Sequence, residues 1–414
     1  MDKIFAALFF SLLTACVSQN PPNTPQITQN PPPPANPANN PNFPENTAQA
    51  ANYLAWKEDF INRAIAHNIS PKTVHQLMDS AVEKHSVSSS DKNQAEFVKS
   101  IWEYVEGAVS QTRINNGRAK LASVKQVTAS SPVPAEIVAA IWGVESGYGA
   151  NTGNIKLADS LGTLAYEGRR RKFAEEQLIA LMRLLDSGDL DWHPLTGSWA
   201  GGMGDTQFIP ATWQQFGVDA NGDGRRNAWT TSDALASTAN YLAKSGWIRS
   251  VAPIYEVQLP QKFDYSLIGA KKTCEQWRQL GLNILDASFN PQTEATLWLP
   301  AGINGPKLLQ TKNFSVIKVY NHSDNYALAV SLLARAIGGG SAKFHTDWPR
   351  GEGKLSRSQI AQIQTRLTQL GFDTKGNDGV AGTNTRRAFS NWQKANGQIP
   401  DGFMSPRSAA PLLR

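Results

Sequence analysis

One glutamate, Glu145, occupies a position where a carboxyl group could act as a general acid. Residues 134–149 read PAEIVAAIWGVESGYG, in which Pro134 favours the start of a helix and Ile141 and Val144 lie on one apolar face. Glu145 stands beside that face, and glycines end the predicted helix just beyond it. An apolar wall favours the neutral form of a carboxyl group, which is the form that can donate a proton. An isolated glutamate is more often solvated or ion-paired on a helix surface, so the assignment needs further residues.

A second stretch, residues 197–210, supplies neutral hydrogen-bonding groups in place of a second charge. It reads GSWAGGMGDTQFIP, so small residues let the backbone approach a ligand while Ser198 and Gln207 can donate and accept hydrogen bonds. The alternative is structural, with the serine capping a turn and the glutamine holding backbone groups. Tyr320 and Asn321 precede a predicted helix farther along the chain. A buried tyrosine capped by asparagine is their structural alternative.

These stretches resemble a known family of cell-wall enzymes. Glu145, Ser146 and Gly149 match the Glu-Ser-x-x-Gly signature of the lysozyme-like transglycosylases, and residues 197–210 resemble a block of the membrane-bound lytic murein transglycosylase B family. The resemblance extends over residues 49–345. It implies that Glu145 is catalytic and that the substrate cleft is lined by Ser146, Ser198, Gln207, Tyr320 and Asn321.

Two arginines, Arg169 and Arg170, form a weaker part of this resemblance. The family carries arginines near the peptide stem of its substrate, and Arg169 and Arg170 match that position with an offset of one residue. A solvated basic helix start accounts for them equally well. Arg169 and Arg170 are therefore candidates for substrate binding, and a solvent-exposed basic helix start is the structural alternative.

The resemblance implies cleavage of the β-1,4 bond between N-acetylmuramic acid and N-acetylglucosamine in peptidoglycan. Glu145 would protonate the leaving oxygen and then accept the proton of the muramyl C6 hydroxyl, which closes a 1,6-anhydro ring without any cofactor. One alternative is a hydrolysing muramidase, which needs a second carboxylate several ångströms away. Asp159 and Asp205 are the nearby candidates for that carboxylate. A non-catalytic wall-binding scaffold is the alternative from another class of protein.

Residues 219–225, DANGDGR, fit the first half of a calcium-binding EF-hand loop. Oxygen-bearing side chains occupy loop positions 1, 3 and 5, and glycine occupies position 6. Thr230 at position 12 cannot supply the usual bidentate carboxylate, and the family closes a longer loop with a later aspartate. An Asx-rich turn without metal is the alternative. The implied ligands of one structural Ca²⁺ are Asp219, Asn221, Asp223, Arg225 through its backbone carbonyl, and Asp233.

The N-terminus resembles that of a bacterial lipoprotein. Residues 1–15 hold a short apolar run and small residues directly before Cys16, which is typical of a secretion signal and too short for a spanning helix. The lipobox resemblance implies lipidation of Cys16 and, because no Asp follows it, anchoring at the periplasmic face of the outer membrane. Residues 16–48, rich in Pro and Asn, predict an extended tether. An ordinary signal peptide or a disulfide between Cys16 and Cys274 are the alternatives.

The remaining sequence predicts an α+β fold that is mostly helical. Residues 49–345 indicate a lysozyme-like catalytic domain with helical additions and a small sheet, whose strand signals lie at 254–259 and 294–299. Pro and Gly in residues 346–354 mark a linker. Residues 355–414 predict a small all-α domain of three helices.

This last domain is basic and resembles the small peptidoglycan-binding domain of many wall enzymes. Residues 350–414 contain ten Lys or Arg and four Asp or Glu, so this segment carries the whole net charge of +6. A basic surface suits an anionic polymer. Gly371 should end its first helix, and Ser405 with Pro406 should begin its third. The expected partners are peptidoglycan strands, membrane lipid through Cys16 and other cell-wall enzymes, but not nucleic acid.

The lipid anchor gives a first prediction. Changing Cys16 to Ala removes the acylated thiol, so the protein should move from the membrane fraction to the soluble periplasmic fraction. Cell fractionation with immunoblotting measures this distribution, and Cys274→Ala serves as the matched control. A Cys16→Ala protein that stays with membranes would contradict the anchor.

Overall fold

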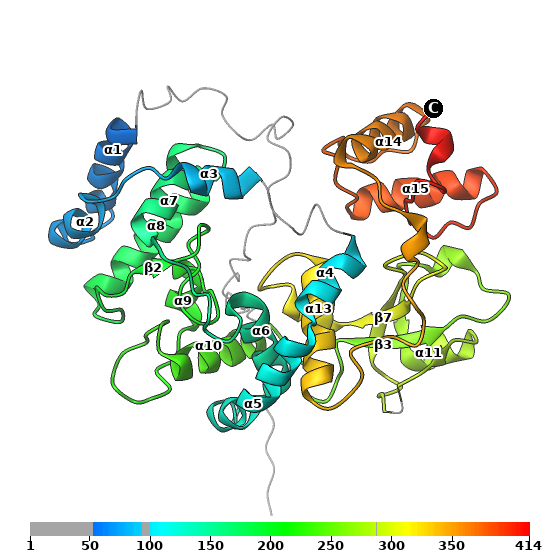
Figure 1. The fold of residues 1–414 in the computed structure, drawn as a ribbon, viewed down its shortest axis with the longest axis horizontal. Coiled ribbons are helices and arrows are strands. Elements are labelled where there is room, and N and C mark those ends of the chain that lie inside the picture. Colours follow the sequence, from blue (N-terminus) through cyan, green and yellow to red (C-terminus); the bar gives the residue numbers. More distant parts are fainter. Residues whose placement is uncertain (1–52, 93–99, 287) are drawn as a thin grey trace, which may run out of the picture.

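The computed structural model describes residues 53–92, 100–286 and 288–414 (Figure 1). The predicted signal peptide, Cys16 and the tether of residues 16–48 lie outside the described residues. In the part of the chain that is described, no helix is long and apolar enough to span a membrane. The four buried hydrophobic clusters correspond to a helical lobe, a central helical bundle, a small sheet and a C-terminal module.

The helical lobe, at the upper left of Figure 1, is built around two helices that pack along each other. The stripe Leu178, Leu181 and Leu185 recurs at helical spacing in the second of them and is buried, which explains why this segment folds as an amphipathic helix. The helices of this lobe are α1 Tyr53–Ala66, α2 Pro71–Met78, α3 His85–Lys92, α7 Leu157–Tyr166, α8 Arg171–Asp186 and α9 Pro210–Phe216.

The central bundle surrounds the helix that carries Glu145. This helix, α6, is buried on most of its faces because α5, α10 and α13 pack against it. Gly143 allows one close contact, since a Cβ atom there would lie 2.6 Å from the Tyr148 ring. The helices of the bundle are α4 Ile101–Ala108, α5 Gln111–Val127, α6 Ala135–Ser146, α10 Thr231–Lys244, α12 Lys312–Ile317 and α13 Asp324–Ile337.

Two antiparallel sheets complete the predicted catalytic domain of residues 49–345, which is called the catalytic region below. A two-stranded ribbon pairs Ile155 with Gly197 and so ties the chain after α6 to the start of the 197–210 stretch. The five-stranded sheet has the order β4-β6-β7-β3-β5 and is covered by the short helix α11. The predicted strands at 254–259 and 294–299 are confirmed as β3 and β6. The bounds are β1 Ile155–Lys156, β2 Thr196–Gly197, β3 Ile254–Gln258, η3 Tyr265–Leu267, β4 Lys271–Thr273, α11 Cys274–Gln279, β5 Asn283–Ile284, β6 Glu294–Trp298 and β7 Lys307–Thr311.

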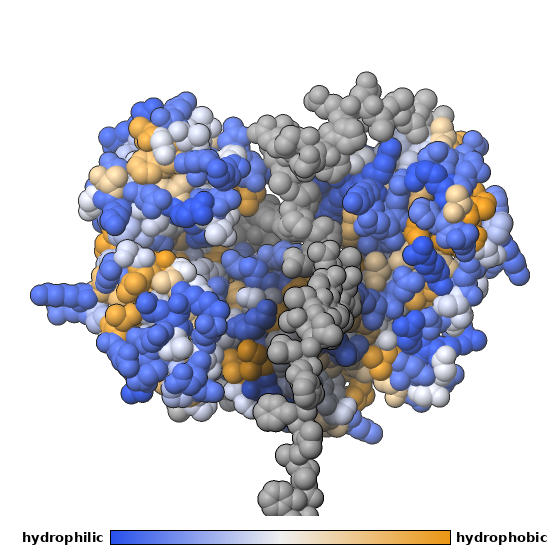
Figure 2. Space-filling view, turned by 180° about the vertical axis from the view of Figure 1, so that it is seen from behind, coloured by the Kyte–Doolittle hydropathy of each residue, from blue (hydrophilic) through white to orange (hydrophobic). Residues whose placement is uncertain are grey.

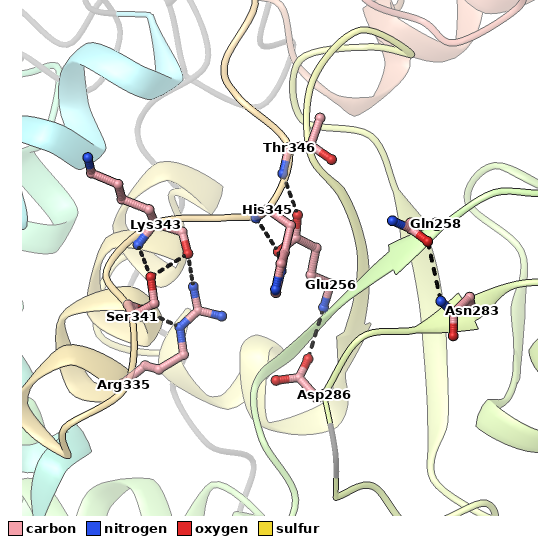
Figure 3. A network of polar contacts seen from close by, with 9 residues as sticks. All are labelled: Glu256, Gln258, Asn283, Asp286, Arg335, Ser341, Lys343, His345 and Thr346. Carbon is pink, nitrogen blue, oxygen red and sulfur yellow. Dashed lines mark hydrogen bonds and ion pairs between the residues drawn. The ribbon is translucent and has the colours of Figure 1, made fainter.

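A buried glutamate on β3 fixes the chain as it leaves the catalytic region (Figure 3). The Glu256 carboxylate is 2% exposed and accepts hydrogen bonds from the backbone N–H groups of His345 and Thr346, at 2.9 and 3.0 Å. The Glu256 backbone N–H in turn donates to Asp286. Burial raises the pKa of Asp286, and the positive charge of Arg335 opposes that shift. The start of the predicted linker is therefore held against the sheet.

The C-terminal module contains η4 Arg350–Glu352, α14 Arg357–Gln369, α15 Thr383–Ala395 and η5 Ala410–Leu412. Gly371, at a φ of +90°, follows the end of α14 as predicted. The third helix is only partly confirmed. Ser408 N–H donates to the Ser405 hydroxyl, as expected of a helix cap, but the segment continues as a turn and the short 3-10 helix η5. Pro411 has no N–H group to extend a regular helix.

Figure 2 shows the molecule from behind, and hydrophilic residues dominate that face. Hydrophobic residues appear there as separate small patches among polar ones, which is ordinary for a protein surface in water. The apolar residues of the described segments gather mainly in the four interior clusters.

Candidate active site

Glu145 lies on the last turn of α6, where the backbone turns sharply. Three consecutive residues after the helix, Gly147, Tyr148 and Gly149, have positive φ, and Gly147 at +64° forms the left-handed cap. This turn ends the helix immediately after Glu145, so the carboxyl group reaches a pocket of about 110 Å³ while the side chain stays half-buried. The lining residues are Glu145, Gln207, Phe208, Ile209, Thr212, Tyr241, Tyr320 and Asn321.

Tyr326 contacts the Glu145 carboxyl group, which the sequence had not indicated. Its hydroxyl donates a hydrogen bond of 2.6 Å to Glu145 Oε1. Burial, and then the nearby Glu145 charge, hold the pKa of Tyr326 well above its usual value, so the phenol stays protonated and remains a donor. The surroundings of the carboxyl group therefore combine aromatic rings with neutral polar side chains, whereas the sequence predicted an apolar wall. In the sequence Tyr326 reads as a core residue of the predicted helix that follows Tyr320 and Asn321, and that closeness was the only available signal.

Gln207 reaches the pocket from a strained backbone. Its φ is +54°, a conformation that non-glycine residues adopt rarely and that often marks functional sites. Its side-chain amide nitrogen donates to the carbonyl oxygens of Thr152, at 2.9 Å, and Gly204, at 2.8 Å. Both amide N–H bonds are thus used internally, which leaves the carbonyl oxygen as the accepting end. The structural alternative and the predicted binding role are compatible for this residue.

Ser198 and Gly202 close the turn beside Gln207. The Ser198 hydroxyl accepts the Gly202 N–H at 2.9 Å, so it caps this turn. A Cβ atom at position 202 would lie 2.6 Å from Gln207 Oε1 and 2.8 Å from the Ser198 hydroxyl oxygen. Glycine is therefore required for the two polar side chains to lie close together. Ser198 is partly exposed but is not among the pocket-lining residues.

Ser146 is buried next to Glu145 and contacts the backbone around the site. Its side chain is 1% exposed, and its hydroxyl donates to the Asp205 carbonyl at 2.5 Å while accepting the Gly149 N–H at 2.9 Å. These bonds join the turn after α6 to the stretch that carries Gln207. These contacts give Ser146 a positioning role, and its contact with substrate stays a prediction.

Tyr320 and Asn321 do line the pocket with Glu145. The Tyr320 ring packs edge-on against Phe208, with 5.4 Å between centroids, and its hydroxyl shares a 2.9 Å hydrogen bond with Thr238. Burial raises the pKa of Tyr320 well above its usual value. The Asn321 side-chain oxygen accepts the Ser323 N–H and so shapes the turn into α13. Tyr320 and Asn321 therefore lie at the predicted substrate position and also make structural contacts within the protein.

Arg169 and Arg170 lie at the turn before α8 and are not among the pocket-lining residues. The Arg170 guanidinium stacks over the Trp199 ring at 5.7 Å from its centroid. Trp199 directly follows Ser198, so Arg170 borders the stretch that shapes the site. This placement is compatible with a contact to a substrate that extends beyond the pocket.

The candidates for a second catalytic carboxylate are both engaged elsewhere. Asp159 is 3% exposed and accepts the Val82 backbone N–H at 3.0 Å. Asp205 is 8% exposed and accepts a 2.6 Å hydrogen bond from the Thr231 hydroxyl. Of the described residues that line the pocket, Glu145 is the single carboxylic acid.

The loop at 219–233 supplies oxygen atoms of the kind that calcium prefers. Both carboxylate oxygens of Asp219 accept loop N–H groups, from Gly222 and Gly224. Both oxygens of the buried Asp233 likewise accept N–H groups, from Ala220 and Asn227, so this residue ties the two ends of the loop. Within the described segments, no three acidic, His or Cys side chains converge into a metal-binding group. The donor set fits calcium chemically, in a loop that also satisfies its own hydrogen bonds.

A mainly helical domain that presents one half-buried glutamate among neutral polar groups defines the lysozyme-like class of glycan-cleaving enzymes. The chain belongs to the Transglycosylase SLT domain family, which it matches over residues 52–335. Residues 356–409 match the Putative peptidoglycan binding domain family. The two matches fall on the catalytic region and the C-terminal module.

Solved structures and a curated relative resemble the chain over most or part of its length. SltB3 from Pseudomonas aeruginosa, in complex with NAG-anhNAM-pentapeptide, is 40% identical with a TM-score of 0.83, covering 88% of this chain and 100% of that one. Membrane-bound lytic murein transglycosylase B of Escherichia coli is 36% identical over 212 residues, which is 50% of this chain and only 57% of that protein. The E. coli lytic transglycosylase SLT35, in complex with calcium, is 27% identical with a TM-score of 0.58, covering 68% of this chain and 92% of that one.

The contact between Tyr326 and Glu145 predicts an effect on the pH profile. A hydrogen bond to a carboxylate favours its charged form and is worth about 1.5–3 kcal/mol, or about one to two pH units. In Tyr326→Phe, Glu145 should keep its proton to higher pH, so the alkaline limb of kcat against pH should move upward by about one unit or more.

Tyr241→Phe is the matched control, because this tyrosine also lines the pocket but donates to the Val319 carbonyl. It should leave the alkaline limb in place. An unmoved limb in Tyr326→Phe, in a variant that still folds, would show that the contact does not tune Glu145.

Proposed function

We propose that this chain is a lytic transglycosylase that cleaves the β-1,4 bond between N-acetylmuramic acid and N-acetylglucosamine with formation of 1,6-anhydromuramic acid ends. The observation that carries the proposal is the lone carboxyl group of Glu145 in a pocket otherwise lined by neutral side chains. Hydrolysis normally uses a second carboxylate to activate water or to form a glycosyl intermediate. Internal ring closure requires one group that gives a proton and then takes one.

In the proposed reaction, Glu145 donates its proton to the glycosidic oxygen as the bond from that oxygen to the anomeric carbon breaks. The C6 hydroxyl of the same muramyl residue then bonds to the anomeric carbon and gives its proton to Glu145. The substrate's acetamido group stabilises the positive anomeric carbon between these steps. No water is consumed, and the enzyme returns to its starting protonation state. A product of this kind, NAG-anhNAM-pentapeptide, is bound in the SltB3 structure.

The surrounding residues support this use of one carboxyl group. Tyr326 fixes the orientation of the Glu145 carboxyl and stabilises its charge after the first proton transfer. The Gln207 carbonyl oxygen can accept a sugar hydroxyl or acetamide N–H, because internal bonds occupy its amide nitrogen. Both groups are neutral, so neither competes with Glu145 for the proton.

For cellular location, we propose periplasmic action from a lipid anchor at Cys16 in the outer membrane. The support is the lipobox-like sequence and the similarity to an E. coli protein described as membrane-bound. The basic C-terminal module, which belongs to a peptidoglycan-binding family, would hold the enzyme on the wall. Remodelling or turnover of peptidoglycan is the resulting role.

We also propose a structural calcium ion in the 219–233 loop. The related SLT35 structure is described as a complex with calcium. In this chain Asp219, Asn221, Asp223, the Arg225 carbonyl and Asp233 would hold the ion, which would neutralise their charges and stiffen the loop ahead of α10. The ion takes no part in the proton transfers.

The central prediction concerns Glu145. Glu145→Gln keeps the size and hydrogen bonding of the side chain but cannot give or take a proton, so turnover should fall at least ~10²–10⁴-fold. Mass spectrometry of digested sacculi measures the anhydro-muropeptides that are released. Glu136→Gln, the same change on a partly exposed residue of the same helix, should have little effect.

The product identity separates the alternatives. Anhydro ends support the transglycosylase, whereas reducing ends together with a comparable collapse in Asp205→Asn would establish a hydrolase. Sacculi left intact by the wild-type protein would establish a wall-binding scaffold.

The calcium proposal predicts a change in thermal stability. Calcium at a hundredfold excess over its Kd should stabilise the wild-type fold by about 2.7 kcal/mol, because the ion binds the native state alone. The double variant Asp219→Ala, Asp223→Ala should lose that increment, whereas Asp373→Ala, which removes a carboxylate paired with Lys375 in the C-terminal module, should keep it. A wild-type melting temperature that is the same in calcium and in chelator would rule out the site.

A further inference from the structure

The chain on both sides of Asp205 lies directly against the segment that leads into α10. On one side, a Cβ atom at Gly204 would lie 1.8 Å from the Ala228 carbonyl oxygen, so this close approach requires glycine. On the other side, the fully buried Thr206 donates from its hydroxyl to the Ala234 carbonyl, at 3.4 Å. The position of this stretch is therefore set by the start of α10.

Asp205 itself makes the strongest of these contacts. The Thr231 hydroxyl donates a 2.6 Å hydrogen bond to one oxygen of the Asp205 carboxylate, and Thr231 is the first residue of α10. Asp205 is only 8% exposed. A hydrogen bond to a charged group is stronger than one between neutral groups, and losing it is costly when the group is buried. The Asp205 side chain is thus fixed beside the helix N-terminus.

The other side of Asp205 faces the turn that ends α6. Its backbone carbonyl accepts the Ser146 hydroxyl at 2.5 Å, and the same hydroxyl accepts the Gly149 N–H at 2.9 Å. A Cβ atom at Gly149 would lie 3.0 Å from Asp205 Oδ1, so this turn also packs on the carboxylate. Ser146 directly follows Glu145 in the chain. One buried residue therefore connects α10 with the turn beside the catalytic carboxyl group.

Gln207, the neutral group on the other side of the pocket, is held separately. Its amide nitrogen donates to the carbonyl oxygens of Thr152 and Gly204, and neither of these belongs to Asp205. A change at the contact between Asp205 and Thr231 should therefore disturb Glu145 more than Gln207.

We propose that Asp205 is a positioning residue for Glu145, which uses its contact with Thr231 to fix the turn after α6 and so the orientation of the catalytic carboxyl group. The inference rests on the proposed function for the role of Glu145. It gives the buried aspartate a role other than that of a second catalytic acid. A positioning contact needs only an oxygen that accepts a hydrogen bond, whereas a second acid must exchange a proton.

The test uses the full chain and a soluble four-sugar peptidoglycan fragment. Thr231→Val keeps nearly the same shape but removes the hydroxyl donor. It should lower kcat about five- to fiftyfold, because a small misplacement of a catalytic group slows the reaction strongly. KM should stay within about twofold of wild type, because Gln207 keeps both of its contacts. Thr231→Ser, which restores the hydroxyl, should recover most of the loss.

Thr230→Val is the matched control. It makes the same change at the preceding residue, whose side chain forms no capping hydrogen bond, and should behave as wild type. The rates are compared at a temperature well below the melting transition of every variant, with near-ultraviolet circular dichroism to show that each one is folded.

Two further variants separate positioning from acid chemistry. Asp205→Asn keeps a side-chain oxygen for Thr231 and leaves the backbone carbonyl in place, so it should retain most of kcat. In a Ser146→Ala background, Thr231→Val should cost less kcat than in wild type, because both side chains act through Asp205.

Equal kcat values for Thr231→Val, Thr230→Val and wild type would overturn the inference while leaving the proposed function intact. A variant that loses thermal stability but keeps its kcat would do the same. A collapse in Asp205→Asn together with a normal rate in Thr231→Val would make the carboxylate an acid catalyst and rule out the positioning role. A wild-type protein that releases no anhydro-ended product would remove the proposed function and this inference together.

Discussion

The contact between Tyr326 and Glu145 joins two helices that the chain builds far apart in sequence, and the rest of the catalytic region is arranged around it. Helix α6 must end directly after Glu145, which requires the left-handed turn at Gly147. The first turn of helix α13, which carries Tyr326, must lie beside the end of α6, and its position depends on the turn at Asn321 and Ser323. The small residues of the 197–210 stretch then bring Gln207 to the same pocket.

A single titrating group places strict demands on its neighbours. Any second acid in the pocket would share protons with Glu145 and shift its titration. The structure avoids this by using Asp159 and Asp205 for backbone and hydroxyl contacts outside the pocket lining. The polar groups near Glu145 include the side-chain amides of Gln207 and Asn321 and the phenol of Tyr326. Such groups hydrogen-bond across the whole physiological pH range without changing charge.

Local signals in the sequence predicted local structure well. The proline before α6, the glycines after it and the strand-favouring residues of β3 and β6 all act within a few residues, so their effects are visible without tertiary information. The family resemblance located Glu145, Gln207, Tyr320 and Asn321, and the structure brings these four together. Tyr326 was missed because its neighbours mark it as an ordinary core residue, and only the packing of α13 on α6 shows otherwise. The positioning contacts of Ser146 could not be read from the sequence, because the Asp205 carbonyl that its hydroxyl reaches lies far along the chain.

Gln207 shows how narrowly this site constrains its own chemistry. A left-handed backbone favours glycine or asparagine, and either would relieve the strain at this residue. Glycine lacks the amide altogether, and asparagine is one methylene short of the reach that the two carbonyl contacts use. A glutamate would keep that reach but would turn a donating nitrogen into a charged oxygen facing two carbonyl oxygens. None of these residue types therefore combines an unstrained left-handed backbone with an amide that reaches both carbonyl oxygens. The protein keeps glutamine at this position at a conformational cost.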